Sequence, residues 1–418
     1  MSLLYNAAIH LMNGVLAVAS IGNSKIRTML QGRRHTLDTL AETRRLVAPA
    51  GFDYWFHAAS LGEFEQGRHL IERIRREHPD VSILLSFFSP SGYKVRCNYS
   101  EVDAVCYLPA DTPAAVRAFL DAAQPRCAII IKYEFWNNLL GELQRREIPT
   151  YSISSIFRPG QRFFRSWGEP FRRVLRCFTH LYVQDENSRD LLASIGITNV
   201  TVAGDTRFDR VTDIRRNAKP LPAVVEALVA DSPFTLVVGS SWQPDEDIIF
   251  PWWHANPDCR LIVAPHEFGP HRLERMLHDL GKGAYLLSQI IDKPLPADCR
   301  AIIVDCFGLL SSLYRIASVA YIGGGFGAGI HNINEAAVYG IPVIYGPNNH
   351  KFKEARDLAS AGGGFEIAGS DDFIITLDRL HRDPQFRSHA GSIAGDYIAR
   401  NIGASDIMYN DFFPNTPQ

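Results

Sequence analysis

Two stretches of the chain repeat one pattern, in which short apolar runs alternate with helical segments such as Phe64–Glu77 and Pro113–Ala122. This alternation constrains the fold more than any other feature, because it is typical of parallel sheets covered by helices. The strands predicted in the first stretch are Phe52–Ala58, Val81–Phe87, Ala104–Tyr107, Cys127–Ile131, Thr150–Ser154 and Leu181–Val183. Those predicted in the second are Phe234–Val238, Arg260–Val263, Ala301–Val304, Val319–Ile322, Pro342–Ile344 and Gly364–Ile367. The sequence therefore predicts two α/β domains.

A chain of 418 residues is long enough to give each domain its own core. Between the two stretches, residues 213–233 contain Pro220 and Pro222 and are expected to be a linker. We expect Rossmann-like domains at 51–212 and 234–400, and a C-terminal tail, 401–418, that packs back toward the first domain. Ligands of open α/β sheets bind outside the carboxyl ends of the strands, so polar residues at those ends are the functional candidates.

The first 50 residues differ from the rest of the chain. Leu3–Gly22 carries no formal charge and is mainly apolar, although Asn6, His10 and Asn13 dilute it, and four basic residues follow: Lys25, Arg27, Arg33 and Arg34. Such a segment can just span a bilayer, lie in its interface, or form a buried amphipathic helix. Positive charge after the segment disfavours a signal peptide. If the segment spans the bilayer, the same charge is expected to leave the body of the protein in the cytoplasm. We expect a membrane-associated segment.

Charge and cysteine content exclude several classes. A net charge of −2 offers no global attraction for nucleic acid, and 46% apolar with 21% charged residues is typical of a globular protein. The seven cysteines are scattered and contain no CxxC pair: Cys97, Cys106, Cys127, Cys177, Cys259, Cys299 and Cys306. This usage favours reduced thiols in a cytosolic compartment over a disulfide framework or a zinc site.

The most informative string in the second domain runs from Tyr321 to Ala337. A predicted strand enters a loop with five glycines (Gly323, Gly324, Gly325, Gly327 and Gly329), and a helix is expected to begin near Asn332. Glycines allow the backbone to approach a phosphate, and the N–H groups at a helix start supply donors. Glu335, in the first turn, can accept hydrogen bonds from ribose hydroxyls. The spacing fits neither a dinucleotide fingerprint nor a Walker loop. The alternative is a glycine turn in which Glu335 caps its own helix.

In the first domain, two glutamates follow predicted strands. Glu63 ends the string His57-Ala-Ala-Ser-Leu-Gly-Glu63, where a general base is expected to face a cleft, although Ser60-x-x-Glu63 is also a capping box. Glu134 follows the strand Cys127–Ile131 and is either an active-site carboxylate or a solvated residue at a helix start. Arg207, in Gly204-Asp-Thr-Arg-Phe-Asp209, is either a cation for a substrate or a salt-bridge partner of a neighbouring aspartate.

The stretch from Ile156 to Arg176 interleaves aromatic residues with six arginines: Arg158, Arg162, Arg165, Arg172, Arg173 and Arg176. Arginines bind phosphates bidentately, and aromatic side chains suit a bilayer interface. A phosphorylated glycolipid would use both, whereas a solvated amphipathic helix would use neither. The net charge of the chain disfavours nucleic acid as the partner.

From about Trp55 to Asp357 these strings resemble the Kdo (3-deoxy-D-manno-octulosonic acid) transferases, which build the inner core of lipopolysaccharide. The resemblance rests on His57 to Glu63, on Lys132-Tyr-Glu-Phe-Trp136, on Gly204 to Asp209, on the glycine loop with His331 to Glu335, and on Gly346-Pro347 with the following Asn349 to Glu354. It implies a GT-B fold, in which two Rossmann-like domains face across a cleft. It also implies a metal-independent, inverting enzyme without a cofactor, using CMP-Kdo as donor and a lipid A precursor as acceptor at the cytoplasmic face of the inner membrane.

By the same resemblance, Glu63 is the proton acceptor, Glu134 supports the transition state, and Arg207 stands where the family usually has lysine. The residues expected to contact CMP are Pro265, His266, Gly308, Leu309, Leu310, Asn332, Ile333, Asn334 and Glu335. The chain departs from the family at His266, where arginine is common, at Leu309, where glutamate is common, and at Trp242, where histidine is common. Because histidine is only partly charged near neutral pH, Arg272 is a possible substitute in binding phosphate.

Two other functions fit part of the pattern. One is a GT-B enzyme that uses a UDP-sugar, such as a lipid A disaccharide synthase or a sugar-nucleotide epimerase. The other is a non-catalytic protein of the membrane surface that binds anionic lipid through the arginine stretch.

Overall fold

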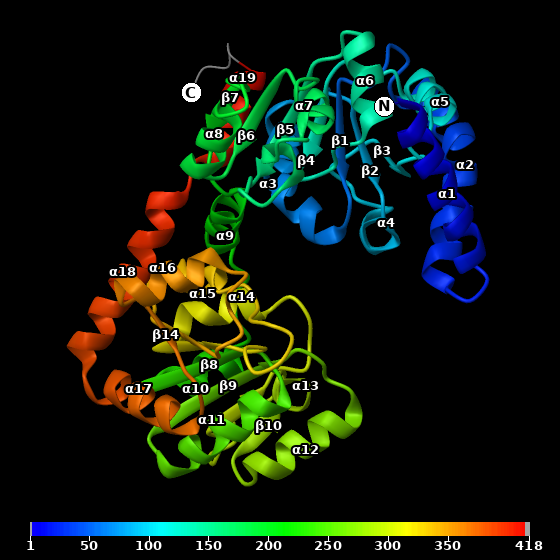
Figure 1. Ribbon diagram of the computed structural model, residues 1–418. Coiled ribbons are helices and arrows are strands. Elements are labelled where there is room, and N and C mark those ends of the chain that lie inside the picture. The colour runs from blue at the N-terminus through cyan, green and yellow to red at the C-terminus, as the bar shows by residue number, and fades with distance from the viewer. Residues whose placement is uncertain (1, 414–418) are drawn as a thin grey trace. The chain divides into compact units, whose positions relative to one another are not determined.

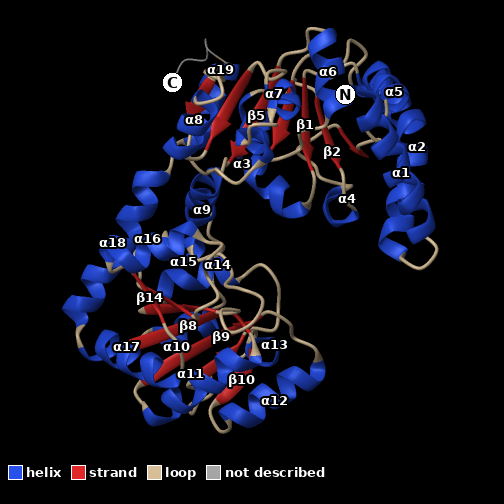
Figure 2. Ribbon diagram, viewed as in Figure 1, coloured by secondary structure: helices blue, strands red, loops and turns tan. Residues whose placement is uncertain are grey.

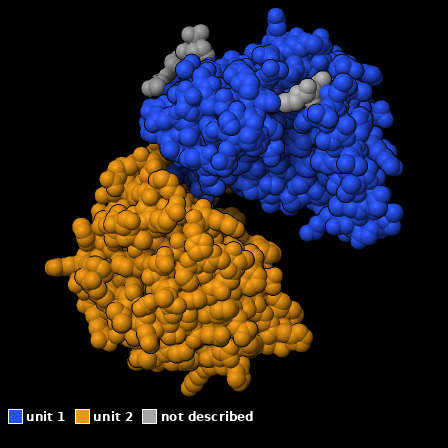
Figure 3. Space-filling model, in the orientation of Figure 1, with its two compact units in different colours: residues 1–209, 403–418 blue, residues 210–402 orange. Residues whose placement is uncertain are grey.

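The computed structural model describes residues 2–413, which form two compact units (Figure 3). Unit 1 comprises residues 1–209 and 403–418, and unit 2 comprises residues 210–402. Each unit is built on one parallel sheet of seven strands (Figure 2). The two α/β domains predicted from the sequence are therefore present.

In unit 1 the strand order is β3-β2-β1-β4-β5-β6-β7. The strands are β1 (Tyr54–Ala58), β2 (Ile83–Phe87), β3 (Ala104–Tyr107), β4 (Ala128–Ile131), β5 (Thr150–Ser155), β6 (His180–Val183) and β7 (Val200–Val202). The helices between them are α3 (Leu61–Glu77), α4 (Pro90–Arg96), α5 (Pro113–Ala123), α6 (Asn137–Arg145), α7 (Glu169–Leu175) and α8 (Glu186–Ala193), with a 3-10 turn at Arg162–Phe164.

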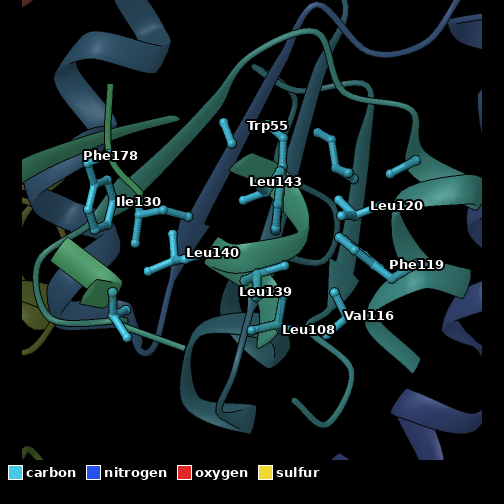
Figure 4. Packing of buried hydrophobic residues seen from close by; sticks show 14 of the residues in the cluster. Trp55, Leu108, Val116, Phe119, Leu120, Ile130, Leu139, Leu140, Leu143 and Phe178 are labelled. Carbon is cyan, nitrogen blue, oxygen red and sulfur yellow. The ribbon is translucent and has the colours of Figure 1, made fainter. Parts of the chain in front are cut away.

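Helices cover both faces of this sheet, because successive side chains of a strand point to opposite sides. Trp55 packs with Phe119 of α5 and Leu140 of α6 on one face (Figure 4). Its neighbour Phe56 packs on the other face with Phe64 of α3. The central strands are buried on both sides, which explains why the sequence shows them as continuous apolar runs.

In unit 2 the strand order is β10-β11-β9-β8-β12-β13-β14. The strands are β8 (Phe234–Ser241), β9 (Cys259–Pro265), β10 (Ala284–Leu286), β11 (Ala301–Ile303), β12 (Val319–Ile322), β13 (Val343–Tyr345) and β14 (Gly364–Glu366). The helices are α10 (Ala223–Val229), α11 (Gln243–Ala255), α12 (Pro270–Leu280), α13 (Leu287–Ile290), α14 (Leu310–Leu313), α15 (Asn334–Ala337), α16 (Lys353–Ala361), α17 (Ser370–Arg382) and α18 (Pro384–Asn401).

The expected linker, 213–233, is not a separate segment. Helix α9 (Thr206–Arg216) carries the chain from unit 1 into unit 2, and the residues after it belong to unit 2. There Val224, Val225 and Leu228 of α10 are buried, so this stretch contributes to the second core.

The C-terminal helix α19 (Ala404–Phe412) belongs to unit 1, where it packs on α3 and on the β1, β5 and β6 side of the sheet (Figure 1). The hydroxyl of Tyr182 donates to Asp411 at 2.7 Å. At the helix start, the carboxylate of Asp209 accepts from the N–H groups of Gly403 and Ser405 at 2.6 and 2.7 Å. The tail thus packs on the first domain, through residues far apart in the sequence.

The N-terminal residues form helices α1 (Ser2–Ala19) and α2 (Ser24–Val47). Helix α1 is docked through one face: the hydroxyl of Tyr5 donates to the Asp111 carboxylate at 2.7 Å, and Ile9 is buried. Another face exposes Leu4, Leu11, Val15 and Val18, each with at least 59% of its surface accessible. None of the helices within residues 2–413 combines the length and apolar content that crossing a bilayer requires.

Candidate functional site

The carboxyl ends of β1, β2 and β4 bring a set of polar side chains together in unit 1. Strand register places His57 beside Ser86 of β2. The ring of His57 lies 2.9 Å from the Ser86 hydroxyl through Nδ1 and 3.3 Å from the Glu134 carboxylate through Nε2. Trp55 donates to the same hydroxyl at 2.8 Å. Because an ionised carboxylate can only accept, Nε2–H of His57 donates to Glu134. The chain of contacts therefore fixes Glu134 from within the core.

Glu134 is held as an anion. Its side chain is 13% exposed, and it also accepts a hydrogen bond from the indole N–H of Trp136 at 2.7 Å. Burial raises the pKa of this carboxyl, but the hydrogen bonds from His57 and Trp136 outweigh burial and leave the pKa below its ordinary value. Glu134 thus carries a negative charge at neutral pH.

The pKa of Glu63, in the first turn of α3, is shifted in the opposite direction, above its ordinary value. Burial and the nearby charge of Glu134 raise its pKa, against smaller opposing effects of the Ala59 N–H, Lys132 and His57. Two carboxyl groups whose environments move their pKa values apart are the arrangement by which sites separate acid–base roles. The Ala59 N–H donates to Glu63 at 2.7 Å, while Ser60 makes no side-chain cap. Because Glu63 bonds to the residue before the N-cap and not to Ser60, neither hydrogen bond of the capping box is formed, although Glu63 does satisfy a backbone N–H.

The backbone at Lys132 is strained. Its φ of +62° lies in the left-handed region, which residues with a Cβ rarely adopt. Strand β5 holds this conformation: the Lys132 N–H donates to Ile153 at 2.9 Å, and the Ser155 hydroxyl donates to the Lys132 carbonyl at 2.9 Å. Strain held by flanking hydrogen bonds is concentrated at functional sites. It turns the chain directly before Glu134.

Arg207 is bound to Asp205. The guanidinium donates from Nε and Nη2 to one carboxylate oxygen of Asp205, at 2.9 and 2.7 Å. The salt-bridge alternative is thus realised with Asp205, whereas Asp209 caps α19. The side chain of Arg207 remains 31% exposed.

In unit 2, glycines permit the loop after β12 to pack closely on its neighbours. A Cβ on Gly323 would lie 2.3 Å from the Ser240 carbonyl oxygen, and one on Gly325 would lie 2.5 Å from the Cα of Gly346. Gly324 has a φ of +92° and donates its N–H to the buried Asp245 carboxylate at 3.0 Å. These three glycines are required by the protein's own packing, while a Cβ on Gly327 would meet only a backbone oxygen at 3.8 Å.

The helix expected from Asn332 is shorter than predicted, because α15 extends only from Asn334 to Ala337. Asn332 accepts from the Asn334 N–H at 3.2 Å and donates to Glu335 at 3.2 Å. The Ser311 hydroxyl donates to the other oxygen of Glu335 at 2.7 Å. Ile333 and Asn334 are fully buried, so among residues 332–335 only Asn332 and Glu335 present side chains at the surface.

Three aromatic rings lie together beyond the ends of β8, β9 and β12. His266 stacks on Trp242 at 4.7 Å between ring centroids and lies 4.6 Å from His331. Burial and the proximity of His266 lower the pKa of His331. Arg272, the possible substitute for phosphate binding, instead donates to the buried Glu246 carboxylate at 2.6 Å and to the Ser241 carbonyl at 3.1 Å.

The other residues predicted to contact CMP lie on the same side of this sheet. Pro265 ends β9 and is buried, and Gly308, with a φ of +80°, precedes Leu309 and Leu310 at the start of α14. Leu309 is 8% exposed, which limits it to backbone contacts. One mixed cluster, Asp258, Cys259 and His381, lies at the opposite end of β9, where an ion pair between His381 and Asp258 accounts for it.

Several candidate residues were not identified from the sequence. His57 lies in a quoted string, but its partner Ser86 is on another strand. Phe307 is 86% exposed, and its ring centroid lies 4.6 Å from that of Phe268, so the two rings form an apolar surface beside Gly308. The sequence pattern gave no signal for this pair.

Comparisons with known proteins bear on the family and the fold of the chain. Residues 28–210 match the family model described as 3-Deoxy-D-manno-octulosonic-acid transferase (kdotransferase). The chain is 26% identical over 354 residues to the 3-deoxy-D-manno-octulosonic acid transferase of Aquifex aeolicus (strain VF5), covering 83% of this chain and 92% of that protein. It is 24% identical over 364 residues to the protein of the same name from Haemophilus influenzae, covering 84% of each.

Among solved structures, the UDP-GlcNAc 2-epimerase from Neisseria meningitidis bound to UDP-GlcNAc has a TM-score of 0.60 and 15% sequence identity. The match covers 87% of this chain and 100% of the epimerase. At this identity the likeness shows the fold, which is of the GT-B type with two Rossmann-like domains.

Proposed function

Because the chain belongs to the 3-deoxy-D-manno-octulosonic-acid transferase family, we propose that it transfers Kdo from CMP-Kdo to a lipid A precursor with inversion at the anomeric carbon. The observation that carries this proposal is the carboxylate pair of unit 1. Glu134 is fixed as an anion at the carboxyl edge of the sheet, and burial together with the charge of Glu134 raises the pKa of Glu63. A carboxylate with a raised pKa is a stronger base than an ordinary glutamate.

In this mechanism the acceptor hydroxyl attacks the anomeric carbon of Kdo while Glu63 takes its proton. The new bond joins the acceptor oxygen to that carbon, and the bond from the carbon to the CMP phosphate breaks, so CMP leaves with the electron pair. The charge of Glu134 favours the positive character that develops at the sugar carbon, and its hydrogen bonds with His57 and Trp136 hold it in place.

The donor half of the proposal places CMP at the carboxyl edge of the unit 2 sheet. Glu335 already accepts from Ser311 and Asn332, and a carboxylate has about four acceptor positions in all, so it can also accept from ribose hydroxyls. The imidazoles of His266 and His331 are the candidates for the phosphate, because Arg272 is bound to Glu246. Pro265, Gly308, Leu309, Leu310, Ile333 and Asn334 support this edge mainly through backbone and packing.

We propose that Arg207 is the cation that neutralises the leaving phosphate or the sugar carboxylate. The side chain of Arg207 is 31% exposed and donates from Nε and Nη2 to Asp205. The carboxylate of Asp205 therefore orients Arg207, and its charge offsets part of the positive charge that a phosphate would meet.

We infer that helix α1 holds the protein at the cytoplasmic surface of the inner membrane. Its exposed stripe of Leu4, Leu11, Val15 and Val18 follows helical periodicity, which suits a helix lying in the interface plane. The acceptor, a membrane lipid, would be reached from this surface.

Mass spectrometry of the product formed from CMP-Kdo and a lipid A precursor tests the function directly. We expect the acceptor mass to rise by Kdo residues and CMP to be released in equal number. Protection from thermal unfolding by CMP and not by UDP is expected as well. Protection by UDP alone would favour a UDP-sugar enzyme, and lipid binding without any transfer would favour a non-catalytic membrane protein.

A further inference from the structure

Unit 1 contains a cavity of about 710 Å³ whose walls are mainly apolar. Aromatic rings dominate its lining, including those of Phe135, Phe163 and Phe171. Sites for small ligands have volumes of about 300–1,000 Å³ and are lined mainly by such side chains. The cavity is therefore large enough for a ligand and offers it a mainly apolar lining.

The cavity connects two parts of the molecule that the proposed function uses. Tyr5 contributes from helix α1, whose other face exposes the apolar stripe. Tyr133 contributes from the loop that carries Glu134, and Asn137 contributes from the first residue of α6. Trp167, 61% exposed, also lines the cavity, so the apolar surface continues to the outside.

Charge at this cavity is positive and uncompensated. Arg162 and Arg165 line it and are exposed, and within residues 2–413 neither has a carboxylate within 4 Å. Arg176, farther along the same stretch, is paired with Glu169 at 2.5 Å. Arg162 instead stacks over the ring of Phe171 at 4.9 Å. Two guanidinium groups beside an apolar cavity match a ligand with an anionic head and a hydrocarbon chain.

We propose that this cavity binds one acyl chain of the lipid acceptor, while Arg162 and Arg165 bind a phosphate of the same molecule. This inference rests on the proposed Kdo transfer and adds to it how the acceptor is positioned. An acyl chain anchored beside Tyr133 leaves the sugar of the acceptor next to the loop that bears Glu134. The chain would enter from the membrane surface on which α1 lies.

Gly160 allows a direct test. It lines the cavity, and a Cβ on it would meet no atom within 4 Å, so Gly160→Trp adds a ring to the cavity without a clash at Cβ. Each methylene kept out of the cavity weakens binding about fourfold, so excluding two weakens it about 15-fold. Gly141→Trp is the matched control, because Gly141 also has an open Cβ position in unit 1 but lies outside the lining.

The assay compares kcat/KM for the acylated acceptor with kcat/KM for the same phosphorylated disaccharide without acyl chains, both in detergent micelles. We expect Gly160→Trp to lower the ratio of the two values at least 15-fold, and Gly141→Trp to leave the ratio at the wild-type value. An unchanged ratio in Gly160→Trp would overturn the acyl-chain site. Absence of transfer to both acceptors by the wild-type enzyme would instead remove the proposed function on which the site depends.

A binding measurement adds a readout that does not need turnover. An acceptor with brominated acyl chains should quench the fluorescence that wild type has in excess of Trp167→Phe, because Trp167 lines the cavity. Gly160→Trp should weaken the concentration dependence of this quenching by a similar factor. Equal quenching by a brominated phospholipid, with no competition from the acceptor, would assign the cavity to bilayer lipid and overturn the proposal.

Discussion

Replacing Glu63 by glutamine separates the two roles that its carboxylate can have. Glutamine keeps an oxygen that can accept the hydrogen bond now donated by the Ala59 N–H at 2.7 Å, but it cannot take a proton from a hydroxyl. A positioned general base contributes about 10²–10⁴-fold to a rate, which is about 2.7–5.4 kcal/mol in activation free energy. We therefore expect Glu63→Gln to lower kcat by that factor.

In contrast to its effect on kcat, Glu63→Gln should leave the thermal stability unchanged or raise it. Since burial and Glu134 raise the pKa of Glu63, the folded protein binds this proton more tightly than the unfolded chain does. Stability is therefore lost as the pH rises from the ordinary glutamate pKa through the raised one, and at neutral pH the ionised Glu63 is destabilising. Glutamine removes that charge, so Tm at pH 7 should be equal to or higher than that of wild type.

Glu63→Ala supplies the contrast. It removes the hydrogen bond from the Ala59 N–H as well, at a cost of about 0.5–1.5 kcal/mol. In a domain of this size, that cost lowers Tm by about 1–6 °C. The measurements are CMP release, calorimetric unfolding and CMP affinity, and both variants should keep the affinity for CMP. Retention of more than a tenth of wild-type kcat by Glu63→Gln would refute the role of Glu63 as general base. A loss of Tm as large as that of the alanine variant would show that Glu63 serves to hold the Ala59 N–H.

Three further predictions follow from single contacts. Glu134→Gln removes the charge that raises the pKa of Glu63, so the acid limb of the kcat/KM–pH profile should move to lower pH, and an unchanged limb would contradict the coupling. Gly323→Ala brings a Cβ to 2.3 Å from a carbonyl oxygen, so unit 2 should lose about 1–3 kcal/mol in calorimetry and lose protection by CMP; wild-type Tm would contradict the packing role. Tyr5→Phe removes a hydrogen bond to a buried carboxylate, worth about 1.5–3 kcal/mol, so hydrogen exchange in residues 2–19 should accelerate while that of the sheet does not.

The sequence predicts the sheets well where strands are buried on both faces. The expected Val319–Ile322 has the same bounds as β12, whose four residues are all buried, because a continuous apolar run ends where burial ends. The expected Ala104–Tyr107 also has the bounds of β3, although β3 is an edge strand with two half-buried residues. The edge strands β7 and β10 were missed, since three half-buried residues leave no distinct pattern. The helix predicted after the glycine loop was too long, because the loop is stabilised by side chains such as Asn332 rather than by helical hydrogen bonds.

For the candidate site, the sequence predicts which residues lie at the edge of the sheet, but it does not predict which side chains bond to one another. Glu63 and Glu134 could be assigned to one edge because parallel strands end on the same side of a sheet. The contact between His57 and Ser86 depends on the register of two strands 29 residues apart, which no local pattern encodes. Arg207 illustrates the same limit: the string Asp205-Thr-Arg207 fits both a free cation and an ion pair, and side-chain geometry selects the pair.

The return of helix α19 to unit 1 has a consequence for how the protein is made. Residues 403–413 are translated only after all of unit 2, yet Phe412 packs against Tyr54, Tyr151 and Tyr182 of the first sheet. During synthesis, that aromatic face stays uncovered on the ribosome while the second domain emerges. The nascent first domain therefore exposes an aromatic surface to which a chaperone or the membrane can bind until helix α19 covers it.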